Sequence, residues 1–236
     1  MRKLKFVGLF FLIIAFLSVT PLFPQVLDSI PATSSDETRI LKLLVVADQG
    51  YRKQIPSWRG EIISFIAIVS KALDSQTKIQ LQITKFENWE RKSLKDVSYY
   101  LVEKELAKTF PRINEADFDV VIVLTSHHLE LPAWCWDKDG YILITTKKET
   151  VAFDQYEDVK RRTYPLLSYS ERKVRFPVII LHEIGHIFGC EHETDERFVM
   201  AIRGLSMIFS KESIETIKKN KWRKFPLVPG KSDKGE

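Results

Sequence analysis

The chain has 236 residues, of which 44% are hydrophobic, 28% charged and 11% aromatic, a balance typical of a globular protein with a substantial core. Nine Gly, ten Pro and two Cys exclude a collagen-like chain, a low-complexity chain and a disulfide-rich scaffold. The net charge of +5 includes three basic residues ahead of the first apolar run; without them, 33 Lys and Arg face 31 Asp and Glu. We therefore expect no nucleic-acid partner.

The N-terminus has the pattern of an export signal. Three basic residues precede the apolar run 6–17, as in the first two regions of a secretory signal. Residues 18–23 bring the run close to the roughly 18–20 residues that span a membrane, so a cleaved signal and a retained anchor both stay open. We expect an exported protein, secreted, periplasmic or tethered through residues 6–23, with its domain outside the cytoplasm. Residues 1–25 would form this signal or anchor, and residues 26–38 a linker.

Hydrophobic periodicity predicts alternating strands and helices in the rest of the chain. The predicted elements are a strand over 40–47, a helix over 58–73, a strand over 79–84, a helix over 93–108, a buried central strand over 118–124, a short strand over 141–145 and a C-terminal helix from about Lys211. Helices between strands supply crossovers, so this order predicts an α/β domain with a mostly parallel sheet. The domain would span 39–225 and be followed by a flexible tail, 226–236.

Two of these helices have an expected buried face. In the first, Ile62, Phe65, Ile66 and Val69 recur at helical spacing. In the second, Val97, Leu101 and Leu106 are expected to face the core. Residues 146–172 are polar and carry no clear periodicity, so they receive no assignment.

The chemistry-bearing motif lies between His182 and His192. On a helix, His182 and His186 lie one turn apart on the same face and can bind one divalent ion. Glu183 can reach a water on that ion without occupying a ligand position. Gly189 stands where a helix ends with a left-handed residue, so the chain can turn and supply His192 as a third ligand. Three neutral imidazoles leave the fourth position of a zinc ion open, as in catalytic zinc sites.

This pattern, His182-Glu183-x-x-His186-x-x-Gly189-x-x-His192, resembles the zinc-binding consensus of the metzincin clan of metalloendopeptidases. Met200 lies where those enzymes have the methionine of their Met-turn. The spacing of eight residues after His192 is similar to that of archaemetzincins and matrixins, and the Val-Met pair favours archaemetzincins. The helix between the second and third strands favours archaemetzincins or adamalysins over matrixins.

The resemblance implies more about fold and metal content. It implies an α+β zincin-type fold with a twisted, mostly parallel five-stranded sheet, an antiparallel edge strand along the cleft, a zinc-binding helix and a small C-terminal subdomain. Archaemetzincins have two Cys after the third His that help to form a second zinc site. Glu193 and Phe198 stand at those positions, so we expect one catalytic zinc ion and no second one. Ile202 stands where astacins have a tyrosine ligand, so that ligand is not expected.

The predicted activity is zinc-dependent hydrolysis of peptide bonds in a peptide or protein substrate, by a monomer. Zinc would lower the pKa of a bound water, and Glu183 would take the water proton and deliver it to the leaving amine. Two alternatives are an exported zinc-binding protein without activity and a zinc hydrolase with a non-peptide substrate.

Four weaker features leave alternatives open. His127 and His128 could bind a metal or be ordinary loop residues, and Cys135 and Cys190 could form a disulfide or remain thiols. Residues 131–136 could frame a substrate pocket or only pack in the core. The basic stretch 218–224 could contact anionic lipid or be a solvated surface.

Overall fold

The computed structural model describes residues 37–91, 99–112, 117–127, 133–146, 150–152, 161–163, 167–202 and 204–226. Residues 34–236 form one compact unit. Within the described part of the chain, no helix is long and apolar enough to cross a membrane. The predicted segment boundaries at residues 25, 38 and 225 stay predictions.

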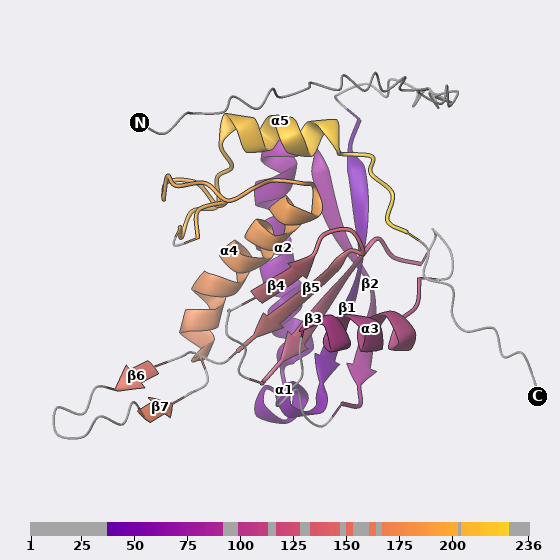
Figure 1. Ribbon diagram of the computed structural model, residues 1–236, viewed down its shortest axis with the longest axis vertical. Helices are drawn as coiled ribbons and strands as arrows, with labels where there is room; N and C mark the ends of the chain where they lie inside the picture. Colours follow the sequence, from indigo (N-terminus) through magenta and orange to yellow (C-terminus); the bar gives the residue numbers. More distant parts are fainter. Residues whose placement is uncertain are drawn as a thin grey trace, which may run out of the picture. The chain divides into compact units, whose positions relative to one another are not determined.

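A five-stranded sheet forms the centre of the domain, in the order β2-β1-β3-β5-β4 (Figure 1). The strands are β1 (Arg39–Asp48), β2 (Ile79–Trp89), β3 (Val120–Thr125), β4 (Ala133–Trp136) and β5 (Tyr141–Thr145). Strands β2, β1, β3 and β5 are parallel, and β4 pairs antiparallel with β5 at one edge. The predicted mostly parallel sheet with an antiparallel edge strand is confirmed.

Helices cover both faces of this sheet, which explains why its central strands are continuous apolar runs. Leu43 and Val45 of β1 pack in one core cluster with α2 (Trp58–Thr77) and α4 (Tyr169–Ile187). Leu44 and Val46, which point the other way, pack in a second cluster with α3 (Tyr99–Thr109). The remaining elements are α1 (Gln49–Gln54), α5 (Lys211–Lys219) and the two-stranded sheet of β6 (Thr150–Ala152) and β7 (Arg161–Thr163).

The predicted buried face of α2 is confirmed, whereas that of α3 is partly wrong. Ile62, Phe65, Ile66 and Val69 are all at most 3% exposed. In α3, Val102 and Leu106 face the sheet, four residues apart, and Leu101 is 54% exposed because it is rotated by about 100° from Val102. Val97 lies outside the described residues.

Several elements differ from their expected extents. Strand β2 continues to Trp89, α1 was not expected, and the expected antiparallel edge strand, which had no predicted residue range, is β4. Helix α4 begins at Tyr169, inside the segment that received no assignment, and it continues through Pro177. The tryptophans of β4 pack against α3, since Trp134 stacks on Tyr99 with ring centroids 4.5 Å apart. They belong to the packing of the sheet face opposite α4, and residues 131–132 lie outside the described chain.

Candidate metal centre

Three imidazole rings meet at the C-terminal part of α4. His182 and His186 lie on one face of the helix, and their Nε2 atoms are 3.1 Å apart. His192, from the loop that follows, places its Nε2 atom 3.1 Å from that of His186. Among the described residues, these three form the one group of at least three His, Cys, Asp or Glu side chains whose ligand atoms all lie within 4.8 Å of one another. The structure thus brings together the three predicted ligands.

Backbone carbonyls determine which nitrogen of two rings carries a proton. Nδ1 of His182 is 2.7 Å from the carbonyl oxygen of Val199, and Nδ1 of His186 is 2.7 Å from that of Cys190. A carbonyl only accepts, so both Nδ1 atoms donate, and each neutral ring presents a lone pair at Nε2. Burial lowers the pKa of His182 to about 4 and lowers that of His186, so neither ring gains a second proton at neutral pH.

These nitrogens fit a zinc ion. Lone pairs that face each other across 3.1 Å repel unless a cation lies between them. Tetrahedral ligands at the zinc–nitrogen distance of about 2.0–2.1 Å are themselves roughly 3.3–3.4 Å apart, close to the observed separation. Carbonyl acceptors behind the ligands are also usual in zinc sites, because they orient the rings and raise their basicity.

A turn at Gly189 brings His192 to the other two ligands. Gly189 has a φ of +88°, in the left-handed region that only glycine adopts at little cost. Its N–H donates to the carbonyl of His186, and the N–H of Cys190 donates to that of Gly185, which ends the helix in the manner expected for a left-handed C-terminal residue. The side chain of Asn220 also donates to the carbonyl of Phe188 at 2.8 Å.

Met200 packs under the helix that carries the ligands. A Cβ atom on Gly185 would lie 2.3 Å from the sulfur of Met200, so a larger residue here would force the helix or the methionine side chain to shift. The N–H of Glu193 donates to the carbonyl of Met200, and this bond joins the His192 loop to the Met200 segment. The neighbouring Val199 carbonyl accepts from His182, so one short segment supports both the helix and the loop.

Glu183 lies beside the first ligand and is 8% exposed. Burial raises the pKa of Glu183 to about 7, and no described residue donates a hydrogen bond to its carboxylate. Cys135 of the edge strand β4 lies close to it: burial raises the pKa of the Cys135 thiol well above its usual range, and the Glu183 charge raises it further. The edge strand therefore borders the carboxylate, on the side where the cleft is expected.

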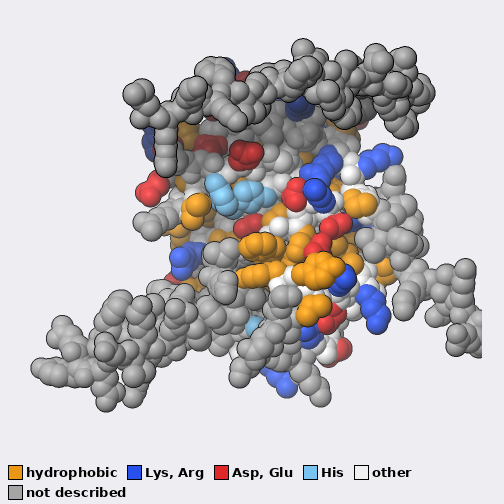
Figure 2. Space-filling model, in the orientation of Figure 1, with side chains coloured by type: hydrophobic (Ala, Val, Ile, Leu, Met, Phe, Trp, Pro, Cys, Tyr) orange, Lys and Arg blue, Asp and Glu red, His pale blue; other side chains and the backbone are white. Residues whose placement is uncertain are grey.

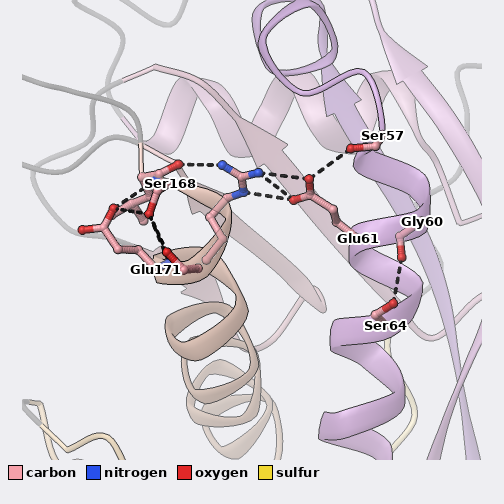
Figure 3. Close-up of polar contacts among 9 residues, drawn as sticks. Ser57, Gly60, Glu61, Ser64, Ser168 and Glu171 are labelled. Carbon is pink, nitrogen blue, oxygen red and sulfur yellow. Dashed lines mark hydrogen bonds and ion pairs between the residues drawn. The ribbon is translucent and has the colours of Figure 1, made fainter.

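The opposite end of α4 is fixed by polar contacts. The Ser168 hydroxyl accepts from the N–H of Glu171 while the Glu171 carboxylate accepts from the N–H of Ser168, which forms a capping box. Arg172 donates three hydrogen bonds of 2.8–3.0 Å to the carboxylate of Glu61 on α2 (Figure 3). Both side chains are at most 10% exposed, so this ion pair joins two helices inside the protein.

The weaker predicted features lie apart from the three ligands or take other roles. His127 Nε2 is 3.9 Å from the Asp48 carboxylate, and His128 lies outside the described residues. Cys135 and Cys190 are both free thiols, so the disulfide is not formed. Glu193 accepts from the hydroxyls of Ser210 and Ser213 and thereby holds the start of α5. On the face of the molecule drawn in Figure 2, pale blue imidazoles lie next to red acidic side chains.

Comparison with known proteins decides the family. The sequence profile of metallo-peptidase family M12, reprolysin type, matches residues 37–204. The chain belongs to this family. The match covers the sheet, the three histidines and the Met200 segment, and it makes the chain a metallopeptidase. A search among curated protein sequences gives no match.

Solved structures show what the M12 domain of this chain is similar to. Archaemetzincin from Methanopyrus kandleri superposes with a TM-score of 0.51 at 17% identity, over 78% of this chain and 96% of that one. A zinc-dependent peptidase from Methanocorpusculum labreanum gives a TM-score of 0.47 at 14% identity, over 74% and 99% of the two chains. The similarity to archaemetzincin confirms the expected zincin-type fold.

Proposed function

We propose that this family M12 chain is a zinc-dependent endopeptidase in which His182, His186 and His192 hold one zinc ion and Glu183 is the general base. The observation that carries the proposal is the convergence of three Nε2 atoms. In two of these rings, Nδ1 donates its proton to a backbone carbonyl, which leaves the lone pair at Nε2. A zinc ion held there supplies a Lewis acid, which lowers the pKa of water and polarises a carbonyl group.

The residues of the chain supply the other parts of the reaction. Glu183 accepts a proton from the attacking water and returns it to the leaving amine, since its carboxylate is buried beside the first ligand and receives no hydrogen bond from a described residue. Met200 and Gly189 act as positioning residues, because one packs against the helix at Gly185 and the other turns the chain toward His192. The substrate is a peptide or protein, as expected for a peptidase.

The test compares three variants of the full chain for bound zinc and for cleavage of a mixed peptide library. Glu183→Gln should keep one equivalent of zinc and lose about 10²–10⁴-fold in kcat, because the base is removed while the ligands stay. His186→Ala should lose both zinc and cleavage. His127→Gln, a histidine substitution away from the three ligands, should change neither.

Two results would contradict the proposal. Cleavage by Glu183→Gln at the wild-type rate would exclude this residue as the base. A zinc-loaded wild type that cleaves no peptide would instead favour a non-catalytic zinc protein or a hydrolase with another substrate.

We also propose that the domain lies outside the cytoplasm, because three basic residues and the apolar run 6–17 begin the chain. An alkaline phosphatase fused after residue 38 is active only when it is exported. It should be active with the native N-terminus and inactive when residues 6–17 are deleted. Activity that persists after the deletion would contradict the export role.

A further inference from the structure

The end of α5 and the segment after it form a basic surface with an exposed tryptophan. Residues 218–224 contain five Lys and Arg and no Asp or Glu. Lys218, Lys219 and Lys224 are exposed, and Trp222 is 37% exposed. These four side chains are called the α5-end surface below. Figure 2 shows blue side chains gathered where the segment after α5 crosses the drawn face.

The inward-facing basic residues of the same stretch hold this surface in place. Lys221 is 3% exposed, and its ammonium group donates to the carbonyl of Glu37, while its own carbonyl accepts from Arg39. Arg223 donates to the carbonyl of Ile187 at the end of α4. The α5-end surface is therefore attached to the start of β1 and to the end of the ligand-bearing helix.

Lys218 and Lys219 give this surface its positive charge at the end of α5. No described acidic side chain pairs with Lys218 or Lys219. Glu215 is the acidic residue of α5 nearest in sequence to Lys218 and Lys219. Its carboxylate pairs with Lys211, at 3.9 Å from the ammonium nitrogen of that residue. Glu37 is exposed near Lys221, and the exposed Lys78, whose carbonyl accepts from the N–H of Arg39, adds a positive charge at the same end of the sheet. The surface keeps a net positive charge.

The sequence sets what lies within reach of this surface. Thirteen residues separate the apolar segment 6–23 from Glu37, and the fourteen steps from Phe23 to Glu37 span at most about 50 Å when fully extended. If the segment inserts in a bilayer, a linker of this length allows the start of β1 and the α5-end surface attached to it to reach the headgroups. Lysines near an anionic bilayer are attracted to it, and tryptophan prefers the interface between lipid and water.

We propose that the α5-end surface binds the anionic headgroups of a lipid bilayer. Lys218 and Lys219 supply the attraction, and Trp222 inserts at the level of the headgroups. Removal of one lysine charge weakens such contact about fivefold, so removal of two weakens it about thirtyfold. The contact is also weakened by salt, because the Debye length falls to about 3 Å at 1 M.

The test uses the full chain reconstituted in vesicles with and without anionic phosphatidylglycerol, each containing brominated lipids that quench tryptophan fluorescence. The difference in quenching between wild type and Trp222→Phe isolates the signal of Trp222 from that of the other four tryptophans.

In anionic vesicles we expect a clear difference in quenching between wild type and Trp222→Phe at low salt, and loss of this difference in 1 M NaCl. The variant Lys218→Gln/Lys219→Gln should lose it as well. The matched variant Lys53→Gln/Lys173→Gln, with two exposed lysines on α1 and α4, should keep it. Peptide cleavage by each variant checks that it is folded.

Three outcomes would overturn the proposal. The first is equal quenching of wild type and Trp222→Phe in anionic vesicles. The second is a difference of the same size in vesicles of phosphatidylcholine alone, which would indicate apolar contact without charge recognition. The third is a difference that the Lys218/Lys219 variant keeps. A change in Trp222 emission caused by an acidic protein or a nucleic acid, with none caused by anionic vesicles, would assign the surface to that partner instead.

Discussion

The two ends of α4 are held in different ways. At the N-terminal end, the Ser168 capping box fixes the start of the helix, and the Arg172–Glu61 ion pair joins the helix to α2. Both contacts lie at the end of the helix opposite to His182 and His186. At the C-terminal end, Gly189 ends the helix, Met200 packs against Gly185, and the ligand rings are oriented by carbonyls.

This difference separates stability from metal binding within one helix. Contacts at the N-terminal end fix where the helix lies, and a buried ion pair contributes mainly because loss of one partner leaves the other charged and buried. Contacts at the C-terminal end orient the three imidazole rings. We therefore expect changes at the first end to lower stability at constant zinc affinity, and changes at the second end to lower zinc affinity as well.

The largest stability effect is expected for Glu61→Gln. It leaves the Arg172 guanidinium buried without a countercharge, which costs about 3–5 kcal/mol in the free energy of unfolding. Chemical denaturation measures this loss, and zinc titration of the folded fraction should give the wild-type affinity. The control Glu90→Gln, in an ion pair whose carboxylate is 67% exposed, should change stability by no more than about 0.5 kcal/mol. Equal losses in the two variants would contradict the expected role of the buried pair.

Gly185→Ala tests the ligand end. Its Cβ would overlap the Met200 sulfur, so helix and methionine must separate, at about 1–3 kcal/mol in unfolding free energy. Because the Met200 segment also supports His182, zinc affinity should fall by about tenfold or more. Gly60→Ala is the matched control, since a Cβ there meets nothing within 4 Å and a helical alanine is favoured. Unchanged zinc affinity in Gly185→Ala would show that the Met200 contact does not position the ligands.

A smaller effect is expected for Ser168→Ala. Loss of the capping box lowers the free energy of unfolding by about 1 kcal/mol and leaves zinc affinity unchanged. Ser64→Ala is a suitable control, because that hydroxyl bonds only to the Gly60 carbonyl within α2 (Figure 3) and caps no helix end. A reduced zinc affinity in Ser168→Ala would remove the proposed distinction between the two ends.

Some parts of the molecule could be predicted because their signals are local. The alternation and apolar runs predicted the central strands, and the spacing from His182 to His192 predicted which three imidazoles the structure brings together. The capping box at Ser168 and Glu171 is also a local signal, and it would have located the start of α4 within the polar segment left unassigned. Leu101 was placed on the wrong face because the phase of a short helix depends on where it packs.

Sequence by itself determined the central strands, the helical spacing of His182 and His186 and the position of the glycine that ends their helix, since each depends on spacing along a helix or strand. Only the tertiary structure decided which carbonyls orient the imidazoles, what a larger residue at Gly185 would meet, and that Arg172 pairs with Glu61, 111 residues away. Those contacts join segments far apart in the chain. Their partners depend on how the helices and loops pack, and no local pattern specifies that.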